Sequence, residues 1–415
     1  MIALRKKSVY LSAVLVLLCQ SCLSGIQPEA PIKKNAFSST FLSATEVPNT
    51  PESFAMTFNA QGQGIAVVGN PLTGLRFHPV EQFKVSSQGT RLTEEIKAGF
   101  YSAENFMLDA QGTGTFFIIQ AELDTFSISP GNEPPRNNRL RIYTVPIQNY
   151  AVAGPLQTLS FTHRYATLHA QSVVVDPEGK GSLTLKLSEA DPDQKMGSRA
   201  LHFVTLPIEK HKIQQQEVNR LAIPADGNLC LNGDLNGAYL FQKGQQWFLQ
   251  AVEKGPLKDE AQALPFTPSG VPALQLSAEG KGYASVQQAH AVEVQGLNQF
   301  VKPVNEMVTL PRWDQNSLMQ IAYDGEQGFS IELSAYTLSS LQLRVRLNYF
   351  SQQGTQTQVF EREVLPFDKG TPPHINTIAT HGSQALFLWS FFDKQKQAWQ
   401  LFWEPIAPYN KLNFP

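Results

Sequence analysis

The sequence predicts an all-β chain: a seven-bladed β-propeller of four-stranded antiparallel blades, preceded by a signal peptide and a flexible tether. A short motif recurs seven times, in copies that begin near residues 54, 105, 172, 229, 274, 318 and 375. The apolar residues of each copy alternate with a period of two, which is the pattern of half-buried strands. Repetition of one strand–turn–strand unit on this scale indicates a ring of similar blades. Residues 41–415 are therefore predicted to form a single domain.

A tight turn joins the two strands of each copy. In the first three copies it has the form Asp/Asn-x-x-Gly-x-Gly and opens with Asn59, Asp109 or Asp176. The opening side chain accepts hydrogen bonds from backbone N–H groups of the turn, and a glycine supplies the positive φ that closes the hairpin. Metal-binding loops need denser carboxylates, so we predict a structural role, with no metal site and no cofactor. The structural turn glycines are Gly62, Gly64, Gly112, Gly114, Gly179, Gly181, Gly237, Gly280 and Gly282.

The third strands of the blades are less regular. Residues 139–143, 200–204 and 399–403 alternate in the same way, and each segment is soon followed by a proline. Proline lacks the donor that a β-ladder needs, so it suits the end of a strand. The ring can close in two ways: residues 41–47 supply the outer strand of the last blade, or residues 409–414 do so alone.

The N-terminus has the pattern of an export signal. A basic segment (residues 5–7) precedes an apolar run (residues 9–18) that is too short to span a bilayer as a helix. The run leads into LCQSC at residues 18–22, which resembles the lipobox of bacterial lipoprotein precursors. Cys19 departs from the leucine usual at its position, and an ordinary cleaved signal peptide is the alternative.

The lipobox resemblance implies where the protein is found. Residues 1–21 are the expected signal peptide, Cys22 carries the fatty-acid-bearing lipid, and residues 22–40 form a tether. The protein is then exported and lipid-anchored to the cell envelope. Because Leu23 rather than Asp follows the cysteine, the outer membrane is the expected location.

Composition narrows the class of partner. Loss of residues 5–7 removes three of the 33 basic residues and leaves 30 against 35 acidic ones. A net negative chain lacks the clustered Lys and Arg that contact phosphates, so nucleic acid is not an expected partner. Cys230, the remaining thiol of the mature domain, lies in an apolar strand and is expected to be a buried packing residue. We expect a monomer.

The sequence contains no catalytic signature: G-x-S-x-G, H-E-x-x-H and the phosphate-binding P-loop are all missing. The segment at residues 384–389 resembles repeats in exported bacterial proteins of uncharacterised function, and this resemblance implies no known activity. We therefore predict a non-catalytic propeller that presents a binding surface to an envelope protein or glycan. The alternative is a carbohydrate-active hydrolase or lyase with its site at the propeller axis.

Two long loops are the expected partner-binding region. They span residues 124–138 and 188–198, join second to third strands in neighbouring blades, and belong to the class of long loops that carry function on rigid scaffolds. Their rim would combine Phe126, Arg136, Asp191, Asp193 and Met196. Two tolerated insertions without a role are the alternative. Asp191 and Asp193 alone supply too few oxygens for calcium.

Overall fold

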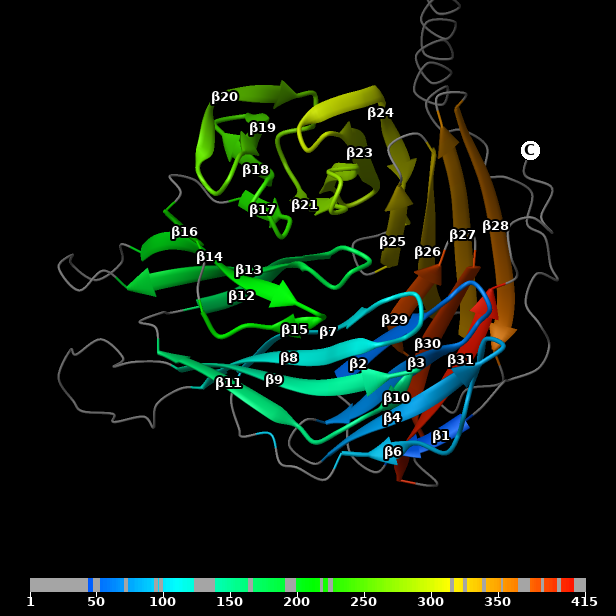
Figure 1. The fold of residues 1–415 in the computed structure, drawn as a ribbon. Helices are drawn as coiled ribbons and strands as arrows, with labels where there is room; N and C mark the ends of the chain where they lie inside the picture. The colour runs from blue at the N-terminus through cyan, green and yellow to red at the C-terminus, as the bar shows by residue number, and fades with distance from the viewer. Residues whose placement is uncertain are drawn as a thin grey trace, which may run out of the picture.

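The chain forms seven antiparallel β-sheets arranged as a ring, as the computed structural model shows (Figure 1). No helix occurs among the described residues, and hence none long and apolar enough to cross a membrane. The structure describes residues 44–47, 53–70, 74–92, 96, 100–122, 139–162, 167–190, 199–216, 219–222, 227–313, 317–323, 327–337, 341–351, 354–364, 374–381, 384–393 and 397–406.

Blades one to three share one layout: three long strands, then a fourth strand in two short pieces that both pair with the third. Blade one consists of β2 (Ser53–Phe58), β3 (Gly64–Asn70), β4 (Gly74–Glu81), β5 (Lys84–Val85) and β6 (Thr90–Arg91). Blade two consists of β7 (Phe100–Leu108), β8 (Gly114–Glu122), β9 (Arg139–Gln148), β10 (Ala151–Val152) and β11 (Gln157–Thr162). Blade three consists of β12 (Thr167–Val175), β13 (Gly181–Ala190), β14 (Arg199–Glu209), β15 (Lys212–Ile213) and β16 (Asn219–Ala222).

Blades four to six are plain four-stranded meanders. Blade four consists of β17 (Gly227–Leu231), β18 (Gly237–Lys243), β19 (Gln246–Val252) and β20 (Leu257–Leu264). Blade five consists of β21 (Val271–Leu276), β22 (Gly282–Gln287), β23 (Ala291–Asn298) and β24 (Lys302–Pro311). Blade six consists of β25 (Leu318–Tyr323), β26 (Gln327–Thr337), β27 (Leu341–Ser351) and β28 (Gly354–Val364). The predicted seven-bladed propeller of four-stranded blades is confirmed.

Blade seven is completed by the N-terminal side of the domain. It consists of β29 (His374–His381), β30 (Gln384–Asp393), β31 (Ala398–Ile406) and, on its outer edge, β1 (Ala44–Val47). Antiparallel pairing of β1 with β31 sets Ala44 opposite Phe402 and Val47 opposite Trp399, so the blue and red ends of the ribbon meet in Figure 1. Joining the first strand to the last blade ties the ring closed. Residues 409–414, the other candidate for closure, lie outside the described residues.

Alternation along each second strand divides its side chains between two neighbouring blades. In β3, Ile65 and Val67 pack in a cluster with blade two, whereas Ala66 and Val68 pack in a cluster with blade seven. All four side chains are at most 1% exposed, although they point to opposite faces. A middle strand is thus apolar on both faces because another blade covers each face, and each large side chain buried in this way contributes about 1.5–3 kcal/mol.

The repeated turn has the predicted hydrogen bonds. Asp109 Oδ1 accepts from the backbone amides of Gln111 and Thr113 at 2.9 and 2.8 Å, and Asn59 makes the same pair of contacts in blade one. Gly112 has a φ of +74°, which a side chain would strain. The same hairpin joins first to second strands in blades three, four and five, where Asp176, Asn232 and Ser277 open the turn.

Candidate functional site: a cleft between blades five and six

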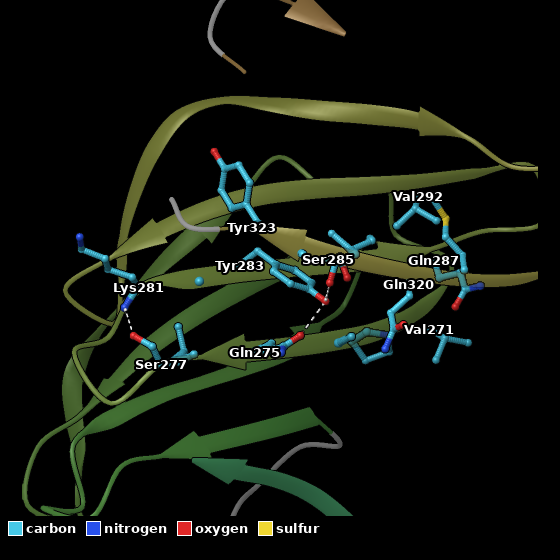
Figure 2. Close-up of a pocket in the computed structure, with 17 residues that line it drawn as sticks. Val271, Gln275, Ser277, Lys281, Tyr283, Ser285, Gln287, Val292, Gln320 and Tyr323 are labelled. Carbon is cyan, nitrogen blue, oxygen red and sulfur yellow. Dashed lines mark hydrogen bonds between the residues drawn. The ribbon is translucent and has the colours of Figure 1, made fainter. Parts of the chain in front are cut away.

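Among the described residues, the first strands of neighbouring blades pack against each other around the ring, and one pair does so much less than the other six. Direct contacts join β29 to β2, β2 to β7, β7 to β12, β12 to β17, β17 to β21, and β25 to β29. Contacts between β21 and β25 are few, and residues of both strands line a cavity of about 570 Å³ (Figure 2). The interface between blades five and six therefore holds a cavity next to the contacts that join these blades.

The walls of this cleft are neutral and polar at its centre. Gln275 of β21 and Gln320 of β25 are exposed side chains from opposite walls, and Ser285 and Gln287 of β22 line the cavity behind them. The lining residues include one cation, Lys281, which lies at the turn end of the cleft in Figure 2. No carboxylate or imidazole is among the residues that line it. The cleft offers hydrogen-bonding groups without the acid and base that most hydrolytic chemistry needs.

Tyr283 bridges the two blades across this cavity. Its hydroxyl donates to Gln275 Oε1 at 2.9 Å and lies 3.3 Å from the backbone carbonyl of Ile321 in β25 (Figure 2). Burial raises the pKa of Tyr283 to about 12, so the hydroxyl keeps its proton at neutral pH. Tyr283 thus orients the Gln275 amide and holds β25 at a set distance from blade five.

The interface between blades five and six combines an apolar cluster with buried polar side chains. Phe350 of β27 packs with Val292 and Val294 of blade five, and further along the same face of β27 come Asn348 and Arg346. Arg346 Nη1 lies 3.0 Å from Glu332 Oε2, and both side chains are buried. Buried charges are costly unless they stay paired, so Glu332 and Arg346 must remain in contact with each other.

Glu332 is held by several groups besides Arg346. The backbone amide of Trp313 donates to Glu332 Oε1 at 2.7 Å, and the Ser317 hydroxyl donates to the same oxygen. Burial raises the pKa of Glu332, while the hydrogen bonds from Ser317 and Trp313 act against that rise. The Arg346 guanidinium also stacks over the Trp313 ring, 4.3 Å from its centroid.

Arg312 joins the two blades at one end of the cleft. It is 9% exposed and donates to the Ser317 carbonyl at 2.9 Å and the Gln288 carbonyl at 3.2 Å. With its amide oxygen turned toward Arg312, Gln287 accepts from Nη2 at 2.6 Å. The segment between β24 and β25 therefore ties a residue of the cleft wall to the polar face of blade six.

The partner-binding and lipid-anchor residues expected from the sequence lie outside the described residues: Cys22, Phe126, Arg136, Asp191, Asp193 and Met196. The predicted turn glycines lie in the described turns of blades one to five, between first and second strands. None of them is close to the cleft centre, although Gly282 borders it.

The axis of the ring was the expected position of an enzymatic site. Among the described residues no group of three or more His, Cys, Asp and Glu side chains could hold a metal ion. Within the first strands of the seven blades as bounded above, Glu104 is the one acidic residue. Hydrolysis of a glycosidic bond ordinarily uses two carboxylates.

Sequence reasoning missed the cleft residues Gln275, Gln287 and Gln320, since glutamines in alternating strands have no distinctive spacing. A signal for the interface did exist. Glu332 interrupts the buried run from Phe329 to Leu333, and the segment that leads to blade six begins with Arg312 and Trp313. A charge inside a strand that is otherwise buried requires a buried partner, and here it marked the polar interface.

No family model matches the chain, and no curated protein is similar to it in sequence. Among solved structures it is similar to the β-propeller domain of the Trilobed protease from Pyrococcus furiosus, at 9% identity and a TM-score of 0.43, over 90% of this chain and 99% of that one. It is also similar to prolyl oligopeptidase B from Galerina marginata, at 12% identity and a TM-score of 0.39, over 83% of this chain and 48% of that one. A third similar structure is the WD40 domain of SCAP from fission yeast, at 10% identity and a TM-score of 0.36, over 88% of this chain and 98% of that one.

Proposed function

We propose that this protein is a non-catalytic β-propeller of the cell envelope, anchored through a lipid on Cys22, that binds an envelope ligand in the cleft between blades five and six. The observation that carries the binding role is the cavity lined by β21 and β25, at the interface where the first strands make the fewest contacts. Pockets of about 300–1,000 Å³ with a few placed polar groups are typical ligand sites. Its lining supports binding more than catalysis.

The enzymatic alternative has less support. A hydrolase at the axis would ordinarily need a pair of carboxylates there; within the first strands as bounded above, Glu104 is the one acidic residue, beside the histidines His169, His374 and His381. Glu332 is an enclosed carboxyl of blade six, but its partners are structural and its side chain is fully buried. Water and substrate do not reach it.

The two long loops after β8 and β13 are a second proposed contact surface. Phe126, Arg136, Asp191, Asp193 and Met196 would form its rim. Deleting residues 127–136 and replacing residues 190–197 with a Gly-Asn turn tests this rim separately from the cleft. If the loops contact the ligand, retention of the ligand falls while the fold survives.

Cross-linking in cells tests the cleft without assuming what fills it. Val271 lines the cleft and is 67% exposed, so a benzophenone amino acid placed there reaches any occupant without disturbing the core. We expect a light-dependent adduct at position 271 and none at position 111, an exposed site on a hairpin of blade two. Equal yields at both positions, or no adduct, would reject the cleft as the binding site.

Metabolic labelling with a fatty acid tests the anchor. The label is expected on the wild-type chain and not on the Cys22→Ala variant. A Cys22→Ala chain that still incorporates the label would show that the anchor is elsewhere.

A further inference from the structure

We infer that the cleft between blades five and six binds an uncharged glycan segment. The Gln275 amide on β21 and the Gln320 amide on β25 would form hydrogen bonds with it from the two walls. This inference rests on the proposed binding role of the cleft and names the class of ligand.

The amides have the chemistry that sugar hydroxyls require. A carboxamide offers an acceptor oxygen and a donor nitrogen side by side, which matches the paired hydroxyls of a pyranose ring. Gln275 and Gln320 are both exposed to the cavity, one on β21 and the other on β25. Tyr283 already donates to the oxygen of Gln275, and this bond sets the orientation of the amide before a ligand arrives. A pre-oriented group loses less entropy on binding.

Apolar side chains also line the cleft. Ala273 lies two residues before Gln275 and so on the same face of β21, and Met319 and Ile321 of β25 are further lining residues. A sugar ring has hydroxyl edges and C–H faces, so a cleft that binds it needs hydrogen-bonding and apolar groups at close intervals. The lining residues of this cleft include both kinds of group.

An extended peptide is the other ligand that could lie between two strands, and the backbone disfavours it. Strand addition needs a row of open N–H and C=O groups. In β21, Pro272 has no N–H, and its carbonyl accepts from Asn228 Nδ2 of blade four at 2.6 Å. In β25, the carbonyl of Ile321 already lies against the Tyr283 hydroxyl. The regular ladder is interrupted on both walls, and the side chains make the contacts instead.

Charge on the lining favours a neutral glycan. Lys281 is exposed at the turn end of the cleft, and the groups between Gln275 and Gln320 are amides, hydroxyls and apolar side chains. A polyuronate would bring one carboxylate for each sugar into a site with a single cation. Neutral sugars meet no such imbalance.

Titration calorimetry tests the ligand class. The full-length chain, purified in detergent, is titrated with maltohexaose, cellohexaose, chitohexaose and mannohexaose, and with a uronic acid hexamer. We expect one neutral hexamer to bind. The Gln275→Ala/Gln320→Ala variant should raise its Kd about tenfold or more, because each lost hydrogen bond weakens binding. A matched variant, Gln61→Ala/Gln111→Ala, removes two exposed amides from hairpin turns of blades one and two and should bind like the wild type.

Three results would overturn the glycan inference: no neutral hexamer binds at millimolar concentration, the uronate binds as tightly as the best neutral hexamer, or the double variant binds normally. Equal melting temperatures for the two double variants exclude unfolding as the cause of lost binding. The adduct at position 271 separates this inference from the proposed function. A protease-sensitive adduct without saccharide binding rejects the glycan and leaves the cleft as a protein-binding site.

Discussion

The amide of Gly255 donates to the carbonyl of Leu235 at 3.0 Å, and this pair reverses the residue types found at the same contact in four other blades. Elsewhere a glycine of the first hairpin accepts from an aromatic or imidazole residue of the second hairpin: Gly62 from Phe83, Gly112 from Tyr150, Gly179 from His211, and Gly280 from Phe300. In blade four the first hairpin carries the side chain, Leu235 at a φ of +60°, and the second hairpin carries the glycine. The space between the two hairpins holds one large side chain, whichever turn supplies it.

A double-mutant cycle at Gly112 and Tyr150 tests this rule. A Cβ added to Gly112 would meet the Tyr150 ring at 2.4 Å, so Gly112→Ala should destabilise the fold by more than about 1 kcal/mol. Tyr150→Gly should also destabilise it, through lost packing. The double variant should lose about 1 kcal/mol less in the free energy of unfolding than the two single losses added together, as measured by urea unfolding. Additive effects would show that the hairpins do not share this space.

The buried pair of Glu332 and Arg346 should be indispensable to blade six. Arg346→Met leaves the carboxyl buried without its cation, and we expect a loss of about 3–5 kcal/mol in the free energy of unfolding. Asp234→Asn is the matched control, because it breaks the exposed pair with Lys180. Its unfolding midpoint should stay at the wild-type value, since solvent screens that pair. Equal effects of the two substitutions would contradict the assignment of a structural role to the buried pair.

His78 should make the fold sensitive to acid. It is fully buried; its Nδ1 lies 2.9 Å from the Ser86 carbonyl, and Nε2 has no hydrogen-bond partner. Burial, the largest cause, lowers the pKa of His78 below its usual 6.5, and the charge of Arg76 lowers it further. The unfolded chain therefore binds this proton first, and stability is lost as pH falls from about 6.5 through the lower folded pKa. Urea midpoints measured between pH 7 and pH 5 should fall less for His78→Gln than for the wild type; parallel curves would exclude His78 as the cause.

Cys230 should be inert until the ring opens. It is 1% exposed, and burial raises the pKa of its thiol to about 11, so almost no thiolate forms at neutral pH. Iodoacetamide should leave Cys230 unmodified in native protein and label it fully in urea, as peptide mapping by mass spectrometry would show. Fast native labelling would mean that blade four opens readily. This fits a chain whose fold rests on packing between blades rather than on a disulfide.

Local sequence patterns and long-range packing determine different parts of this fold. The period of two, the Asp/Asn-opened glycine turns and their number were enough to predict antiparallel hairpins and a seven-bladed ring, because a hairpin is decided by residues within about ten positions of each other. The sequence also suggested residues 41–47 as a closing strand, although it left residues 409–414 as an alternative. Pairing of β1 with β31 selects the first, and that choice joins residues that are far apart in the chain.

The cleft is a product of tertiary structure alone. Gln275 and Gln320 occupy ordinary outward positions of ordinary strands, and nothing near either residue in the sequence marks it. They line one cavity because blades five and six meet there, at an interface where an apolar cluster around Phe350 lies near the buried Glu332, Arg346 and Arg312. The sequence by itself determined the blades, since each is a local unit. Only the packed ring decided which interface holds the cavity, because that depends on how well two distant faces complement each other.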